Sequence, residues 1–272
     1  MSTPLTNSDS SAVAQRQTPA GSQTNRSGYV LSLADDALIA AQRMGEWIAA
    51  SPQIEEDVAL GNIALDLLGQ GRSLLTYAGS LSDPVRTEDD LAYLRDERDF
   101  LNVQLVEREH GRDFGVAMAR LLFLSTYLDE LYGRLRASSD ETLAAIAAKA
   151  VKEVDYHHDH ARMWVLRLGD GTAESHDRMQ AALDAEWPYV EELFGNEHLD
   201  PELVESGVAV DPAVLRDPWH RRVADVLAEA TLAVPDVAPA VTGGRRGVHS
   251  TRMGYLLAEM QHLARSHPGA TW

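Results

Sequence analysis

The apolar residues of this chain recur at helical spacing almost everywhere from Tyr29 onward. In the stretch YVLSLADDALIAAQRMGEWIAA, apolar residues stand at positions 30, 33, 37, 41, 44 and 48, which is the pattern of one buried helix face. Ser51 and Pro52 predict the start of a second helix, with Ser51 as its N-cap, that continues to about Ser80. Because only a very short linker separates the two segments, we expect them to be antiparallel neighbours.

The same pattern continues through most of the remaining chain. Helical segments are predicted from Asp83 to about residue 138, with a break or kink at Gly111, and over residues 140–168 and 173–194. Ser139, Asp140 and Glu141 are expected to cap the start of the helix over 140–168. Two shorter helices are expected near residues 219–232 and 250–265. We find no convincing strand pattern and no internal repeat. The sequence therefore predicts an all-α fold, an antiparallel four-helix bundle with additional C-terminal helices packed on it.

The chain is expected to form one folded domain. Residues 1–28 are rich in Ser, Thr and Gln and are predicted to form a disordered tail. This segment has no apolar stretch of the kind found in secretory signals. Residues 29–272 are predicted to form a single helical domain, in which residues 201–272 are an appendage to the bundle.

Composition excludes several classes of function. A formal net charge of −18 argues against binding to nucleic acids or to anionic membrane surfaces. The chain has no cysteine, which excludes disulfides, thiolate metal ligands and a cysteine nucleophile. No apolar run reaches the roughly 18 residues that a membrane span needs. We therefore expect a cytoplasmic protein that binds neither nucleic acid nor membranes.

The segment KEVDYHHDH, residues 152–160, is the densest group of metal-ligand side chains in the chain. A di-iron site in a helical bundle needs Glu-x-x-His on two helices and a Glu on each of two others, all directed inward. On the helix predicted for residues 140–168, Glu153 and His157 are the inward pair, four residues apart rather than three. A single inward His is typical of a hydrogen-bonded core residue. We expect His158 and His160 to be solvated.

The helix predicted for residues 54–81 is apolar almost all round, so we expect it to be the most buried helix. It has no Glu-x-x-His, because residues 67–70 read LLGQ. Two interpretations of its polar residues remain open. They form either a hydrogen-bonded network, in which Asp66 and Gln70 face Glu153 and His157, or a polar seam against a neighbouring helix. The polar stripe consists of Asn62, Asp66, Gln70, Ser73 and Tyr77.

Three segments, QRMGEWIAASPQIEEDVALGNIALDLLGQGR (42–72), AAIAAKAVKEVDYHHDHARMWVLRLGDGT (144–172) and TGGRRGVHSTRMGYLLAEMQHLARSHPGATW (242–272), carry a family resemblance. Together they resemble the family of the structural subunit, designated C, of phenylacetyl-CoA epoxidase, also called ring-1,2-phenylacetyl-CoA monooxygenase. The blocks LDLLGQGR and LLAEMQHL…PG…W are its most specific part, and it covers residues 29–272.

The resemblance implies a ferritin-like bundle in a multicomponent oxygenase of aerobic phenylacetate degradation. In that family a separate catalytic subunit with a di-iron centre epoxidises the aromatic ring of phenylacetyl-CoA, and a reductase passes electrons from NADPH. The subunit that this chain resembles is implied to be the structural, non-catalytic partner of the catalytic one. The resemblance therefore predicts no catalytic residue, no metal ligand and no cofactor in this chain.

The same resemblance gives a meaning to the polar residues. Leu67 and Gln70 stand where the catalytic subunit has Glu-x-x-His, and Ser125 and Thr126 stand where an inward Glu would be needed. Asp36 is a carboxylate that could still stand in a ligand position. We therefore expect a vestigial buried polar site that consists of Asp36, Asp66, Gln70, Glu153 and His157.

A permanent partner subunit predicts a large and rather apolar interface. The basic pair Arg245 and Arg246 is a candidate contact for an acidic partner surface or a coenzyme A phosphate. Further candidate contacts are the aromatic residues Trp187, Trp219, Tyr255 and Trp272. The sequence leaves open whether the isolated chain forms a homo-oligomer.

Two alternative functions involve a metal in this chain. A di-iron oxidoreductase in its own right would need Glu107 and His110, or Asp155 and His158, to turn inward together with further carboxylates. An iron-storage bundle would also need a carboxylate-rich oxidation site.

Overall fold

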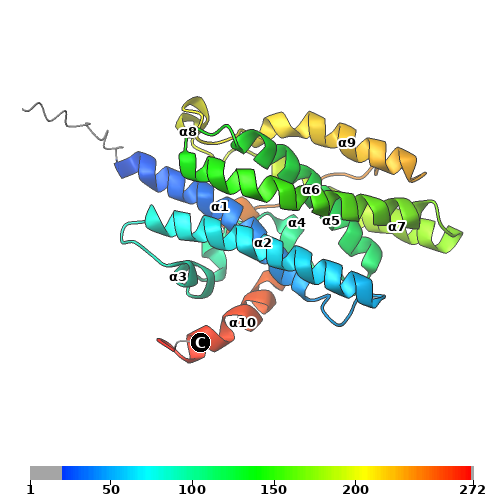
Figure 1. The fold of residues 1–272 in the computed structure, drawn as a ribbon, viewed down its shortest axis with the longest axis horizontal. Coiled ribbons are helices and arrows are strands. Elements are labelled where there is room, and N and C mark those ends of the chain that lie inside the picture. Colours follow the sequence, from blue (N-terminus) through cyan, green and yellow to red (C-terminus); the bar gives the residue numbers. More distant parts are fainter. Residues whose placement is uncertain (1–19, 271–272) are drawn as a thin grey trace, which may run out of the picture.

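Four long helices form the body of the molecule. The computed structural model describes residues 20–270, with residues 20–24 described in their backbone alone. Helices α1 and α2 pack as one hairpin, α5 and α6 pack as a second, and α2 lies against α6 (Figure 1). No β-strand occurs within residues 20–270, so the predicted all-α, ferritin-like bundle is confirmed. The long helices are α1 (Ala20–Gly45), α2 (Ile54–Ser80), α5 (Phe114–Leu135) and α6 (Glu141–Gly169).

Helix α1 begins earlier than predicted. It starts at Ala20, nine residues before the predicted start of the domain at residue 29. Arg26 Nη1 lies 3.1 Å from Asp140 Oδ2, and the Ser27 hydroxyl donates to the Ala78 carbonyl oxygen at 3.0 Å. These contacts tie the early turns of α1 to the start of α6 and the end of α2. Residues 1–19 of the predicted tail lie outside the described part of the chain.

The two predicted helix caps have different outcomes. Asp140 caps α6 as expected, because its Oδ1 accepts from the backbone N–H groups of Thr142 and Leu143 at 3.0 Å each. The prediction that Ser51 caps α2 is wrong, since α2 begins at Ile54 and its N-cap is Gln53. The Ser51 hydroxyl instead donates to a carbonyl oxygen of the preceding turn.

The helix predicted from Asp83 is broken well before Gly111. This part of the chain forms α3 (Glu88–Tyr93), the 3-10 helix η1 (Glu97–Asp99) and the short α4 (Gln104–Glu107). Buried carboxylates on α1 explain the break. Asp35 accepts from the Leu101 N–H at 2.9 Å, and Asp36 accepts from the Val103 N–H at 2.8 Å. These N–H groups are therefore bonded to side chains rather than to carbonyl groups of a continuing helix.

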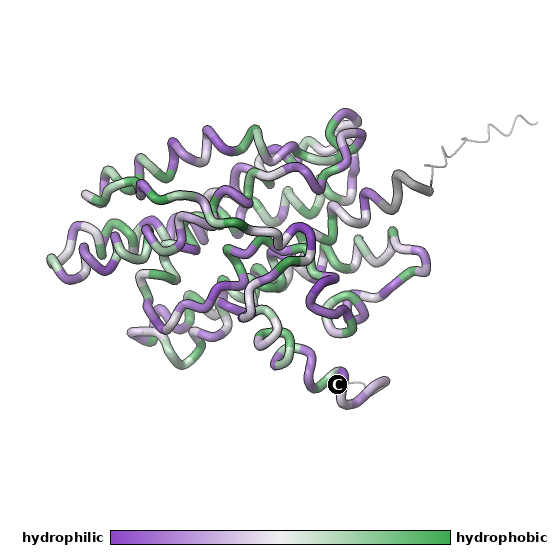
Figure 2. The backbone as a smooth tube through the Cα atoms, turned by 180° about the vertical axis from the view of Figure 1, so that it is seen from behind, coloured by the Kyte–Doolittle hydropathy of each residue, from purple (hydrophilic) through white to green (hydrophobic). Residues whose placement is uncertain are grey.

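The C-terminal third wraps around the bundle. The helix predicted over residues 173–194 changes to 3-10 geometry after Glu186, where Pro188 lacks the N–H that an α-helix needs. Helix α9 lies along α5 and α6, whereas α10 leaves the bundle and packs on α3, α4 and η1 (Figures 1 and 2). None of the described helices is long and apolar enough to span a membrane. The elements are α7 (Ala173–Glu186), η2 (Trp187–Phe194), α8 (Pro201–Glu205), η3 (Pro212–Leu215), α9 (Arg216–Glu229), η4 (Gly244–Arg246) and α10 (Thr251–Ser266).

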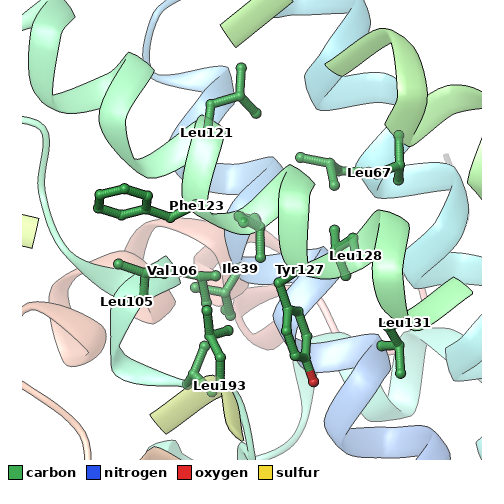
Figure 3. Close-up of a cluster of buried hydrophobic side chains, with 14 of the residues drawn as sticks. Ile39, Leu67, Leu105, Val106, Leu121, Phe123, Tyr127, Leu128, Leu131 and Leu193 are labelled. Atoms are coloured by element: carbon green, nitrogen blue, oxygen red, sulfur yellow. The ribbon is translucent and has the colours of Figure 1, made fainter. Parts of the chain in front are cut away.

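The most buried helix is α5, and not α2 as predicted. Side chains of α5 such as Leu121, Phe123 and Leu128 meet residues from the other elements in one apolar core (Figure 3). Helix α2 buries one face, but Ile54 and Leu65 on the other face are 75% and 65% exposed. Helix α2 is therefore apolar on most sides, but only one of its faces is buried.

The segment Gly243–Ser250, which we call the C-terminal strap, connects α10 back to the bundle. The strap passes so close to the backbone at Asn102 that a Cβ at Gly244 would lie 2.0 Å from the Asn102 carbonyl oxygen. Gly247 adopts a left-handed backbone with φ of 70°, which glycine adopts without steric cost. Gly244 and Gly247 are thus required by the backbone path.

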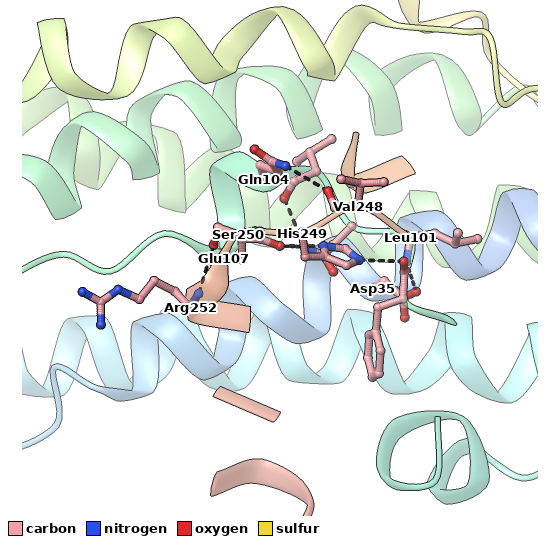
Figure 4. A network of polar contacts seen from close by, with 12 residues as sticks. Asp35, Leu101, Gln104, Glu107, Val248, His249, Ser250 and Arg252 are labelled. Atoms are coloured by element: carbon pink, nitrogen blue, oxygen red, sulfur yellow. Dashed lines mark hydrogen bonds and ion pairs between the residues drawn. The ribbon is translucent and has the colours of Figure 1, made fainter. Parts of the chain in front are cut away.

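A histidine in the strap is held between two acceptors. His249 Nδ1 lies 2.7 Å from Glu107 Oε2, and its Nε2 lies 2.9 Å from the Phe100 carbonyl oxygen (Figure 4). Because both nitrogens face acceptors, the imidazole donates from both and is held in its charged form. Burial lowers the pKa of His249, but the hydrogen bond and charge of Glu107 outweigh this, so the pKa is raised overall.

The raised pKa of His249 predicts a stability contribution that depends on pH. The contribution should be complete below the unfolded-state pKa of 6.5 and should be lost as pH rises through the higher folded-state value. His249→Gln should therefore destabilise the chain by about 2 kcal/mol in mild acid, and by less in alkaline solution. Urea unfolding across this pH range measures the difference.

The exposed His262 on α10 provides the control, since His262→Gln should leave the pH dependence unchanged. A destabilisation by His249→Gln that stays constant or grows with rising pH would contradict the charged-histidine assignment.

Candidate functional site

Four of the five residues predicted for the polar site meet between α2 and α6. Gln70 Nε2 donates to Glu153 Oε2 at 3.0 Å, and His157 Nε2 lies 3.1 Å from Asp66 Oδ2. Gln70 and His157 are buried, whereas the side chains of Asp66 and Glu153 are 37% and 21% exposed. Both interpretations of the α2 stripe therefore apply, because the network is itself the seam between two neighbouring helices.

The seam extends along both helices. Towards the start of α2, Glu56 Oε2 accepts from Trp164 Nε1 at 2.8 Å and lies 3.1 Å from His160 Nε2. Towards its end, the Tyr77 hydroxyl donates to Asp140 Oδ2 at 2.5 Å. Successive partners ascend along α2 and descend along α6, so the helices run antiparallel. Each paired polar group fixes the register, because a shift by one turn would leave it without its partner.

The expectation that His158 and His160 are solvated is wrong, since they are only 9% and 7% exposed. Their burial has two separate causes. His160 is enclosed at the seam by its contact with Glu56. His158 lies on the side of α6 against which α9 packs, close to the charge of Arg222. Burial lowers the pKa of both histidines, so they are neutral at neutral pH.

His157 is also held in its neutral form. Burial lowers its pKa, and the hydrogen bond with Asp66 offsets this effect only in part. The seam consequently pairs a neutral imidazole with a carboxylate and a neutral amide, Gln70, with a second carboxylate. Each pair gives a partner to the polar atoms that face each other across the seam, and neither pair brings a further carboxylate to the same point.

Asp36, the fifth predicted residue, lies apart from the seam. Its Oδ2 is 2.6 Å from Arg245 Nη2, and its Oδ1 accepts from the Val103 N–H. Burial raises the pKa of Asp36, and the Arg245 guanidinium lowers it again in part. The prediction that Asp36 belongs with the residues on α2 and α6 is therefore wrong. Its partner comes from the C-terminal strap.

Arg245 is consequently not available as a surface contact. It is only 9% exposed, and its Nη1 also donates to the carbonyl oxygens of Ser32 and Leu101 at 3.0 Å each. Arg246 is exposed, with one hydrogen bond to the Thr242 carbonyl oxygen. The prediction of a contact site is thus wrong for Arg245, whereas Arg246 stays a prediction.

The aromatic candidates for a partner contact divide in the same way. Trp219 is fully buried and donates to the Phe123 carbonyl oxygen at 2.8 Å, so it is a core residue. Trp187 is half-buried beside it. Tyr255 on α10 is 68% exposed, while Trp272 lies outside the described residues.

The residues at the bundle centre do not fit a di-iron group. Leu67 is buried in the apolar core (Figure 3), and the Thr126 hydroxyl is bonded to a carbonyl oxygen of its own helix at 2.6 Å. The carboxylate of Asp36 is bonded to a guanidinium. Among residues 20–270, no three His, Asp or Glu side chains are placed to hold one metal ion.

The alternative of a metal enzyme requires Glu107 and His110 to act together. Both side chains are buried, but they contact different partners. Glu107 accepts from the Ser250 N–H and pairs with His249, whereas His110 packs against Trp47. In the second pair, Asp155 is exposed while His158 is buried. Neither pair converges with further carboxylates. The network of Glu107 with His249 was not predicted, and its only sequence signal is the position of His249 after a glycine-flanked arginine pair.

Comparisons with known proteins agree with this architecture. The model of the phenylacetic acid catabolic protein family matches residues 1–272. A curated relative, the subunit designated C of the 1,2-phenylacetyl-CoA epoxidase of Escherichia coli (strain K12), is 46% identical over 244 residues, which cover 90% of this chain and 98% of the relative. The resemblance identified in the sequence is thereby confirmed, and the chain belongs to the phenylacetic acid catabolic protein family.

Proposed function

We propose that this chain is the structural, non-catalytic subunit of a phenylacetyl-CoA epoxidase. In this proposal it pairs with a catalytic di-iron subunit, which epoxidises the aromatic ring with dioxygen and with electrons that a reductase takes from NADPH. The observation that carries the proposal is the commitment of the polar residues in the bundle to internal protein partners. Similarity to a protein named as a subunit of 1,2-phenylacetyl-CoA epoxidase supports the choice of substrate.

The bonding of each carboxylate supports the non-catalytic role. Asp36 is neutralised by Arg245, Asp66 is bonded to His157, and Glu153 is bonded to Gln70. A di-iron site instead needs carboxylates that converge on the metals and leave positions open for dioxygen. In this bundle these carboxylates lie apart, at the contact of α1 with the strap and along the seam, and each is already bonded to a protein group.

Iron analysis tests the proposal directly. The chain purified alone should contain almost no iron, and the chain co-expressed with its catalytic partner should contain about two irons per heterodimer. Elemental analysis of both preparations provides the measurement. Stoichiometric iron in the isolated chain would overturn the proposal in favour of a di-iron protein in its own right.

The partner role is supported by an apolar surface over α2 and α6. Ile54, Val58 and Leu65 of α2 and Tyr156 and Met163 of α6 are between 50% and 75% exposed; we call this surface the α2–α6 face. Its helices are neighbours joined by the seam (Figure 1). Leu65 and Tyr156 each directly precede a residue of the Asp66–His157 contact, so in antiparallel helices they lie on the same side of the seam. A contiguous apolar surface of this kind is typical of a protein–protein interface.

Two glycines make the α2–α6 face suitable for another helix. Gly61 and Gly69 lie on the same stripe of α2 as Val58 and Leu65. A Cβ at Gly69 would meet no atom within 4 Å, and one at Gly61 would meet only Ile48 at 4.0 Å. Along this stripe, exposed apolar side chains alternate with gaps at the two glycines. Side chains of a second bundle can pack into these gaps. A related bundle, the catalytic subunit, is the partner we propose for it.

A charge placed on the α2–α6 face should prevent pairing without unfolding the chain. Leu65→Glu should weaken binding to the catalytic subunit at least tenfold, about 1.4 kcal/mol, because a carboxylate would be buried in an apolar interface. Its melting temperature should hardly change, since Leu65 is 65% exposed in the isolated chain. Sedimentation of the mixed subunits measures the affinity.

Val214→Glu is the matched control, because Val214 is 54% exposed on η3, outside α2 and α6. Equal affinity of both variants and the wild type would place the interface elsewhere.

A further inference from the structure

A pocket of about 240 Å³ lies beside one end of the α2–α6 face. It is enclosed by the start of α2, the start of α5, the last turns of α6 and the first turns of α7, which meet at one end of the bundle (Figure 1). Gln53 at its rim directly precedes Ile54, and Trp164 in its wall directly follows Met163. Ile54 and Met163 belong to the α2–α6 face and are 75% and 52% exposed. The pocket is therefore continuous with that face.

The walls of the pocket are apolar and fixed by the bundle. The rings of Phe114 and Trp164 pack edge to face with centroids 4.9 Å apart, an arrangement that aromatic pairs favour. Trp164 is held further by the hydrogen bond that its Nε1 donates to Glu56 across the seam. Leu168 and Met179 add aliphatic surface. Because these contacts lie within one chain, the pocket is already formed before a partner binds.

The charged residues of the lining are bonded to each other. Arg178 Nη2 lies 3.0 Å from Asp113 Oδ2, while Asp113 Oδ1 accepts from the Gly115 N–H at 2.8 Å. The Ser175 hydroxyl donates to the Thr172 carbonyl oxygen at 3.0 Å. The lining contains no other charged residue. An ionised group would therefore find no free counter-charge in the pocket, so the pocket favours an uncharged, apolar occupant.

Size and position decide between a small molecule and a side chain of a partner. Small-molecule sites have volumes of about 300–1,000 Å³, and this pocket is smaller. In protein interfaces, large aromatic side chains contribute most when they fill a well-packed pocket of the other protein. We infer that this pocket receives one bulky apolar side chain, an aromatic one, from the catalytic subunit that covers the α2–α6 face. The inference rests on the subunit role proposed above.

Thiol protection tests whether the partner covers the pocket. The chain has no cysteine, so a single introduced thiol reports on one position. Gln53→Cys changes a rim residue whose side chain makes no cap hydrogen bond, Leu65→Cys marks the α2–α6 face, and Val214→Cys on η3 is the control. Each variant is treated with N-ethylmaleimide, alone and bound to the catalytic subunit, and the mass of this chain gives the alkylated fraction. Binding should slow alkylation at positions 53 and 65 by about tenfold or more, since interface centres exclude water, and should leave position 214 unchanged.

The same three positions separate a failure of the inference from a failure of the proposed function. Protection at position 65 without protection at position 53 would overturn the inference and leave the subunit role intact. A complex that protects neither position would overturn the inference and place the interface elsewhere on the chain. If no complex forms, the inference fails together with the subunit role.

A filled pocket then distinguishes insertion of a side chain from simple cover. Leu168→Trp places a further ring at a half-buried lining position, so it should weaken binding of the catalytic subunit by about tenfold or more. Val214→Trp, outside the pocket, should have no effect. Sedimentation measures the affinity, and the melting temperature of each isolated variant shows that it is folded. Where Leu168→Trp does not fold, Gln53→Trp at the exposed rim closes the pocket instead. Unchanged affinity in whichever of these two variants folds would overturn the inference.

Discussion

The buried carboxylate of Asp36 imposes the arrangement of the C-terminal half of the chain. A carboxylate that is 2% exposed needs a cation and hydrogen-bond donors. The guanidinium comes from Arg245, 209 residues further along the chain, and a backbone donor comes from Val103. The same guanidinium also bonds to the carbonyl oxygens of Ser32 and Leu101. One ion pair thus joins α1, the irregular segment before α5 and the strap that carries α10.

The sequence predicts the parts of the molecule that local patterns determine. The apolar period of α6 and its cap at Asp140 are local, and both are correct. The partner of Asp36 and the burial of His158 and His160 depend on contacts between elements far apart in sequence. No local pattern announces the pairing of Asp36 with Arg245. The same holds for the cover of His158 by α9 and for the contact of His160 with Glu56. Sequence periodicity also shows that α2 is apolar. It does not show which face of α2 the rest of the chain covers.

Most residues of the candidate site were identified from the sequence. The sequence did not indicate that Asp36 lies apart from the other four. Asp66, Gln70, Glu153 and His157 share the faces that helical spacing assigns to them, and they meet as one seam. Asp36 was grouped with them because the family resemblance lets a carboxylate of the first helix stand in a ligand position, and it does face inward. Facing inward is a property of one helix, but forming a site requires that several helices bring their side chains to one point. Here α1 directs its carboxylate to the strap instead.

The seam also explains how α2 can leave apolar side chains exposed. Polar contacts at intervals between Glu56 and Tyr77 fix α2 against α6 along most of its length, so its position does not depend on burying its outer stripe. Exposed Leu and Ile side chains contribute little to the stability of the isolated chain. They contribute only when another surface covers them. Polar groups that converge on a metal in a di-iron bundle act in this chain between two helices, and the outer face of those helices remains exposed.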